Sequence, residues 1–109
     1  MKRGDVVTVA TGGGFGGKPR PALVLQSDSH MTLTTVVVAL LTSDLAETPL
    51  TRTLFQPDAT NHLREPSRLM IDILVTVRLT DVGTIIGQFS PADMARAERA
   101  LMVFLGMAG

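Results

Sequence analysis

A run of apolar and β-branched residues near the middle of the chain constrains the fold most. Residues 32–41 read Thr-Leu-Thr-Thr-Val-Val-Val-Ala-Leu-Leu. Valine, threonine and other β-branched residues favour strands, where they pack well on a pleated surface. The run is apolar enough to be a central strand buried on both faces. We therefore expect a sheet built around this segment.

Shorter runs of the same type lie on both sides of it, separated by Gly, Asp, Asn and Pro, which favour turns. The predicted strands are Val6–Val9, Pro21–Gln26, Thr51–Phe55, Leu69–Val75 and Val82–Gly87. Residues 58–62 read Asp-Ala-Thr-Asn-His and predict a turn or short loop. Most of the chain is therefore expected to be β-structure.

The C-terminal segment has the period of a helix. Ser90 is a suitable N-cap, Pro91 suits the first helical position, and Asp93 gives a capping-box-like start. Gly106 is expected to end the helix. One apolar stripe is predicted to pack on the sheet, consisting of Met94, Ala97, Leu101, Phe104 and Leu105.

Length and composition fit one small domain. A chain of 109 residues is expected to form a single domain, residues 1–109, with an aliphatic core because Trp and Tyr are absent. Five or more strands with one terminal helix predict a mainly β fold with a C-terminal helix, either an SH3-like barrel or a strongly twisted antiparallel sheet.

Charge and cysteine usage restrict the classes of function. Ten basic and ten acidic residues cancel, so any site for an anion must be local. Cysteine is absent, which excludes disulfides and fits a reducing cytoplasm. Asp5 stands where a signal peptide would begin its apolar core, and no apolar run approaches about 18 residues. We expect a cytoplasmic protein with no membrane segment.

The segment Gly12–Pro21 spells two glycine motifs, G-x-G-x-x-G and G-x-x-x-x-G-K. Both motifs must open a helix, and the second needs Ser or Thr after Lys18, where this chain has Pro19. The following residues are of strand type, so we expect a long hairpin connection. Two prolines then hold Arg20 at the entrance of a strand, which is a suitable position for binding an anion.

Metal chemistry has little support in the sequence. His30 and His62 lie in different predicted loops with no second ligand at helical spacing, and no acidic cluster has metal spacing. Exposed loop histidines are the simpler interpretation, and neither a metal nor a cofactor is expected.

The remaining candidates are Arg20, Thr42 with Ser43, and Asp72 with Ser67 shortly before it. When RNA is cleaved without a metal, the 2′-OH attacks phosphorus, and the protein must move protons and stabilise charge on the phosphoryl oxygens. Arginine binds phosphate oxygens through two donors, a threonine hydroxyl can orient the phosphate, and a carboxylate with a raised pKa can exchange the proton.

Each of these residues also has a structural interpretation. Thr42 suits a turn or a strand ladder, Asp72 could pair with Arg68 or cap a backbone amide, and Arg20 could make a structural salt bridge. The residues alone therefore support an anion site without fixing the reaction.

The same residues resemble the MazF/PemK family of toxins from type II toxin-antitoxin pairs. The resemblance rests on Arg3-Gly4-Asp5-Val6-Val7, Pro19–Asp28, Leu40-Leu41-Thr42-Ser43, Asn61-His62-Leu63 with Pro66-Ser67, Leu69-Met70-Ile71-Asp72, and the capped helix. It covers the whole chain in order. It implies a homodimer of SH3-like barrels, a metal-independent endoribonuclease that cuts single-stranded RNA at short sequences, and an antitoxin partner.

The resemblance also implies roles for individual residues. Arg20, Thr42 and Asp72 would be catalytic, and the RNA contacts would be Lys18, Phe15, Ser43, Ser67 and Asn61. Two departures leave the acid and base roles open, because the first loop lacks a histidine and Met70 stands where some members have arginine.

Two other functions remain open at this stage. A gyrase poison of the CcdB type shares the fold, but it uses an aromatic-containing tail, whereas this chain ends Gly-Met-Ala-Gly. A barrel that binds RNA or a partner without catalysis would retain RNA and leave it intact.

Overall fold

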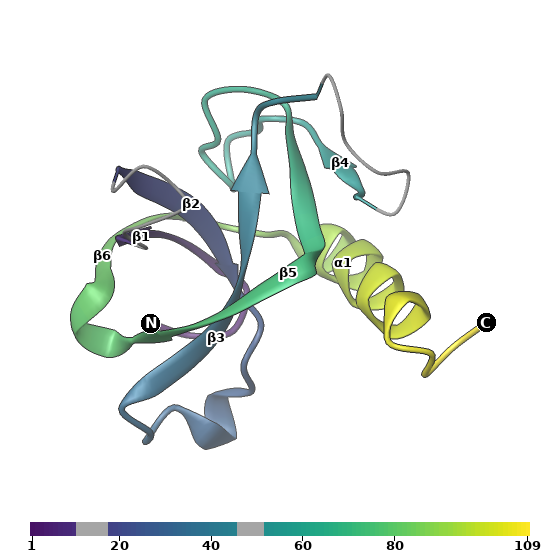
Figure 1. The fold of residues 1–109 in the computed structure, drawn as a ribbon. Helices are drawn as coiled ribbons and strands as arrows, with labels where there is room; N and C mark the ends of the chain where they lie inside the picture. The colour runs from purple at the N-terminus through teal and green to yellow at the C-terminus, as the bar shows by residue number, and fades with distance from the viewer. Residues whose placement is uncertain (11–17, 46–51) are drawn as a thin grey trace.

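The computed structural model describes residues 1–10, 18–45 and 52–109. It has six strands, two short 3₁₀ helices and one α-helix within these residues (Figure 1). The elements are β1 (Asp5–Ala10), β2 (Pro19–Val24), η2 (Asp28–His30), β3 (Thr35–Thr42), β4 (Leu54–Phe55), β5 (Ser67–Arg78), η3 (Leu79–Asp81), β6 (Val82–Gln88) and α1 (Pro91–Phe104).

All strand pairs are antiparallel, and the strands follow the order β4-β5-β3-β2-β1-β6. The sheet curls strongly, and α1 packs beside it near the bend of β5 (Figure 1). The mainly β fold with a C-terminal helix is therefore confirmed, as a curled six-stranded half-barrel.

Two apolar clusters fill the two faces of this sheet. The helix-side face carries Leu23, Leu41 and Leu69, which pack with Met94 and Ala97 of α1. The opposite face carries Ala22, Leu40 and Met70, among other residues. Neighbouring residues on a strand point to opposite faces. The face of each polar residue at a strand end therefore follows from the face of its apolar neighbours.

The strand predictions were right in kind and wrong at several boundaries. The central strand begins at Thr35, because residues 31–34 form a turn and a bend after η2. Its middle residues, Val38 to Leu41, are buried as expected. The strand predicted over residues 51–55 is limited to Leu54–Phe55 among described residues. The strand predicted at Leu69–Val75 extends over Ser67–Arg78.

The helix begins as predicted and ends partly exposed. The Ser90 hydroxyl accepts a hydrogen bond from the backbone N–H of Asp93, and Pro91 is the first helical residue. Gly106 follows the helix with a φ of 77°, which suits glycine. Phe104 and Leu105 were expected in the buried stripe, but their side chains are 46% and 52% exposed. The buried residues of α1 are Met94 and Ala97, in its first two turns, and they lie in one apolar cluster with Leu69 and Ile71 of β5.

A close contact joins β6 to the loop after β4. A Cβ atom on Gly87 would overlap the backbone carbonyl of Asn61, so only glycine fits at this position. The contact fixes the loop that carries residues 61–65 against the sheet. None of the helices among the described residues has the length and apolar character needed to cross a membrane.

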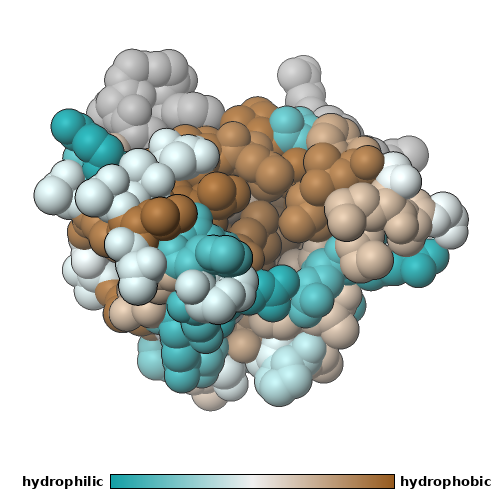
Figure 2. All heavy atoms as spheres, turned by 90° about the horizontal axis from the view of Figure 1, so that it is seen from below, coloured by the Kyte–Doolittle hydropathy of each residue, from teal (hydrophilic) through white to brown (hydrophobic). Residues whose placement is uncertain are grey.

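Several large apolar side chains remain exposed. They include Met102, Val103, Phe104 and Leu105 at the end of α1, and Leu74 in β5. Figure 2 shows that apolar residues on the face seen from below gather in a band across the middle, with polar residues beside it. A contiguous apolar surface of this kind is typical of a protein interface.

Candidate RNA-binding edge of the sheet

Four of the predicted site residues, Arg20, Thr42, Ser43 and Ser67, lie at the edge where β2 begins, β3 ends and β5 begins. In β2 and β3, Ala22 lies opposite Leu40, and continuing this register by two residues brings Arg20 opposite Thr42. Thr42 in turn lies opposite Arg68 of β5. The three residues therefore form a row across adjacent strands, on the face of the sheet that points away from α1, with Thr42 between two arginines.

The side chain of Thr42 is half-buried at this edge. Its Oγ1 accepts a hydrogen bond of 3.2 Å from the backbone N–H of Asp44. Because the hydroxyl still has its own hydrogen, it can donate to a phosphate oxygen. The catalytic role of Thr42 stays a prediction.

Arg68 is held tightly in place. Its Nη1 donates to the carbonyl of Arg52 at 2.7 Å. Its Nε is buried and has no hydrogen-bond partner among the described residues. Arg68 therefore contributes fixed positive charge beside Thr42.

Asp72 lies farther along β5 and has a partner that the sequence did not suggest. Arg52 donates from Nε and Nη2 to the two carboxylate oxygens, with both distances 2.8 Å. The hydrogen bonds and charge of Arg52 hold the pKa of Asp72 below its usual range, although burial acts in the other direction. The expected raised pKa is therefore wrong, and the partner is Arg52 rather than Arg68.

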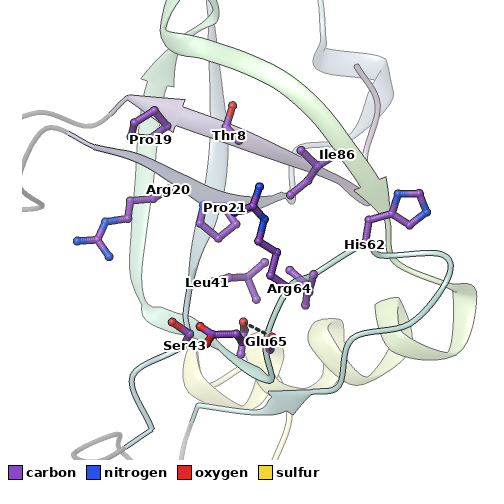
Figure 3. Close-up of a pocket in the computed structure, with 12 residues that line it drawn as sticks. Thr8, Pro19, Arg20, Pro21, Leu41, Ser43, His62, Arg64, Glu65 and Ile86 are labelled. Atoms are coloured by element: carbon purple, nitrogen blue, oxygen red, sulfur yellow. Dashed lines mark hydrogen bonds between the residues drawn. The ribbon is translucent and has the colours of Figure 1, made fainter.

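The helix-side face opens at the same edge into a cavity of about 500 Å³. Its lining is Thr8, Pro19, Arg20, Pro21, Leu41, Ser43, His62, Leu63, Arg64, Glu65, Ser67 and Ile86 (Figure 3). We call this cavity the edge pocket. Arg20 lies at its border, with its exposed side chain directed away from Leu41 and Pro21 (Figure 3).

The RNA contacts proposed from the sequence differ in their fit to this geometry. Lys18 is exposed directly before β2, and Ser43 is exposed in the edge pocket. Ser67 also lines the pocket, but it is largely buried and donates to the carbonyl of Glu65. Phe15 lies outside the described residues.

Asn61 does not fit the expected RNA contact, because its side chain is fully buried. Its Oδ1 accepts from the backbone N–H groups of Asp58 and Leu63, and its Nδ2 donates to the carbonyl of Gln56. Asn61 therefore shapes the loop that presents Leu63 and Arg64 to the edge pocket.

Three charged or titratable residues of the pocket were not predicted, namely His62, Arg64 and Glu65. His62 is exposed, as expected, and adopts a left-handed backbone conformation with φ 55°. In the described part of the chain, no cluster of three or more His, Cys, Asp or Glu residues could hold a metal ion. The edge pocket thus combines arginines, hydroxyls, one imidazole and one carboxylate with apolar walls.

The comparisons with known proteins agree on one family. A family profile described as "PemK-like, MazF-like toxin of type II toxin-antitoxin system" matches residues 2–105. The chain is 39% identical over 109 residues, and over the full length of both chains, to a "Probable endoribonuclease MazF" of Mycolicibacterium smegmatis (strain ATCC 700084 / mc(2)155). It is 33% identical over 86 residues to "Endoribonuclease MazF6" of Mycobacterium tuberculosis (strain ATCC 25618 / H37Rv), covering 77% of this chain and 75% of the relative.

Solved structures resemble the fold closely. An "Endoribonuclease in complex with its cognate antitoxin from Mycobacterial species" superposes with a TM-score of 0.81 at 22% identity, covering 100% of this chain and 98% of the other. The "Mycobacterium tuberculosis toxin MazF-mt6" gives 0.75 at 24% identity, covering 91% and 93%. At these identities the likeness concerns the fold alone.

Proposed function

Because the chain belongs to the PemK-like, MazF-like toxin family of type II toxin-antitoxin systems, we propose that it is an endoribonuclease that cleaves single-stranded RNA and arrests growth until an antitoxin binds it. The observation that best supports this function is the row of Arg20, Thr42 and Arg68 across three strands. Such a row offers guanidinium charge on both sides of one hydroxyl.

The reaction follows from what this row can do. The 2′-oxygen of the RNA loses its proton to water as it attacks phosphorus, and the 5′-oxygen of the next nucleotide takes a proton from water as it leaves. The products are a 2′,3′-cyclic phosphate and a 5′-hydroxyl. We assign Arg20 to the charge that develops on the phosphoryl oxygens, since a guanidinium keeps its charge and binds two oxygens at once. Thr42 orients the same phosphate.

Asp72 receives a different role from the one that its sequence position suggested. A carboxylate whose pKa is lowered is a weak base at neutral pH, so it is poorly suited to accept the 2′-proton. We propose that Asp72 fixes Arg52, and that Arg52 in turn fixes Arg68 through its carbonyl oxygen. This chain of contacts holds Arg68 in place beside Thr42.

The partners follow from the same family. We propose that the toxin acts in the cytoplasm, where its RNA substrate is found, and that it works as a homodimer. The exposed apolar end of α1 is a suitable surface for self-association. A cognate antitoxin is the expected inhibitor. The gyrase-poison alternative is not favoured, because the relatives reported above are named endoribonucleases.

The direct test is cleavage of a long single-stranded RNA by the purified protein in excess EDTA. We expect discrete fragments that begin with a 5′-hydroxyl and end in a cyclic phosphate. Sequencing the fragment ends gives the recognition sequence. Intact RNA across a broad panel of sequences would contradict the proposal, and retention of RNA without cleavage would instead favour the non-catalytic alternative.

A further inference from the structure

The edge pocket combines an apolar interior with charged groups at its border. Leu41 and Leu63 are almost fully buried and form part of the pocket wall together with Pro21 and Ile86. Its volume of about 500 Å³ lies in the range of about 300–1,000 Å³ that is usual for small-ligand sites. The pocket therefore has the size and the surface to enclose a flat apolar group.

Arg64 is the notable charged residue of this pocket. Its side chain is exposed and makes no hydrogen bond or ion pair with another described residue. In Figure 3 it extends from its loop toward β1 and β2, beside the pocket. Asn61 fixes the backbone of this loop by accepting the N–H of Leu63. Arg64 is thus a cation on a well-anchored loop, with its donors available.

We propose that the edge pocket holds one unpaired nucleobase of the RNA substrate, and that Arg64 binds the phosphate next to that base. This inference rests on the proposed function and adds a subsite to it. Arg20 borders the same pocket, and we place the nucleotide in the pocket next to the phosphate that we assign to Arg20. The pocket then selects which base lies beside the cleaved bond.

The charges and surfaces of the pocket favour a nucleotide over a peptide. A single nucleotide supplies both an apolar flat base and an anion, and the pocket supplies apolar walls with two guanidinium groups at its border. Single-stranded RNA is commonly read by splaying out a base and stacking it on apolar or guanidinium planes. Ser43 and Glu65 add a hydroxyl and a carboxylate that can bind the polar edge of the base.

The test uses an RNA oligonucleotide that contains the recognition sequence, with the attacking 2′-OH replaced by hydrogen so that it binds without being cut. We expect Arg64→Ala to weaken its binding about 10-fold, and to lower the slope of log K against log salt by about 0.7, as for the loss of one phosphate contact. Arg64→Lys should preserve most of the salt slope. Arg78→Ala is the matched control, because Arg78 ends β5 at the far end from Ser67 and pairs with Asp81.

A second series tests for the base itself. Single abasic sites are moved along the oligonucleotide, and we expect one position to weaken binding to the native protein about 10-fold. Ser43→Phe, which fills the pocket from its exposed border, should weaken binding of the intact oligonucleotide and make that abasic position nearly neutral. Its circular dichroism and unfolding midpoint check that the protein remains folded.

The outcomes separate the subsite from the function. The subsite is wrong and the function stands if the native protein cleaves RNA while Arg64→Ala binds the oligonucleotide as tightly as Arg78→Ala does. The same conclusion holds if Ser43→Phe does not change the effect of an abasic site at any position. If Arg64→Ala weakens the binding of an antitoxin peptide and leaves RNA binding unchanged, the pocket is a binding site for the antitoxin and the proposal fails. If the native protein neither binds nor cuts RNA, both fail.

Discussion

Arg52 binds both carboxylate oxygens of Asp72, in a fork-to-fork arrangement with two distances of 2.8 Å. The two side chains are only 14% and 24% exposed, so water screens the pair weakly. The contact joins the segment before β4 to the bend of β5. It therefore connects two parts of the chain that flank the row of site residues.

We expect Arg52→Ala to lower the free energy of unfolding by about 1–3 kcal/mol, because it leaves a partly buried carboxylate without its partner. Urea denaturation measures the change. Asp72→Asn should weaken the pair as well, and the double variant should lose less than the sum of the two single variants. Strict additivity would show that the pair contributes no coupling energy.

The same pair makes stability depend on pH in one direction. The pKa of Asp72 is lowered in the folded protein, so its contribution is complete above the ordinary aspartate pKa of about 3.9 and is lost as pH falls through the lower folded value. Denaturation from about pH 6 down to about pH 2 should therefore show, below about pH 4, a larger acid-induced loss in the native protein than in Asp72→Asn. Equal losses in the two proteins would exclude this origin.

Arg20→Ala should lower kcat for RNA cleavage about 100- to 1,000-fold, as is typical when one stabilising group of a charged transition state is removed. The residue is exposed at the start of β2, so the unfolding midpoint should change little. Arg20→Lys should recover part of the rate, because it restores charge without the two-donor geometry. Full activity of Arg20→Ala would remove Arg20 from the catalytic site, and Arg78→Ala serves as control.

Gly87→Ala should destabilise the protein by about 2 kcal/mol or more, because the added Cβ overlaps the carbonyl of Asn61 and forces the backbone to shift. Thermal unfolding monitors the loss. Gly109→Ala is the matched control, since a Cβ there meets no atom within 4 Å. Similar melting temperatures for both variants would show that the loop after β4 adjusts freely.

Phe104→Asp should shift the protein toward the monomer in sedimentation velocity experiments, if the apolar end of α1 is the surface of self-association. Phe104 is 46% exposed in the single chain, so the substitution removes little packing within it. Arg99→Asp, on the same helix at an exposed position, tests for a general effect of charge. A dimer that persists at low concentration in Phe104→Asp would place the interface elsewhere.

Local sequence signals were sufficient for most of the fold. The N-cap at Ser90 and the β-branched run around Val38 depend on neighbours in the chain, and the structure confirms both. The exposure of Phe104 could not be predicted in this way, because an apolar period does not reveal how far the sheet extends beneath a helix. The start of β3 at Thr35 could not be predicted either, because the residues before it are also of strand type.

The partner of Asp72 illustrates a further limit. The sequence suggested only the nearby Arg68, whereas Arg52 is 20 residues away from Asp72. Its approach depends on how β4 pairs with β5, which brings Leu54 opposite Arg68. Arg64 was missed because a charged loop residue is usually solvated. The sequence did contain one indication of a role for Arg64. It lies three residues after Asn61, in a loop that turns back toward a buried strand.

The order of the strands also has a consequence for synthesis of the protein. β4 and β6 form the two edges of the sheet, and β5 lies between β4 and β3, so both edges and the strand that covers β3 are made after the two central strands, β3 and β2. A nascent chain that has not yet reached Ser67 lacks Arg68, one of the two arginines beside Thr42, and leaves β3 as an open edge. Chains that stop before Ser67 therefore lack part of the row of site residues, and we expect early stop codons among the survivors when cells are selected for growth in the presence of the gene.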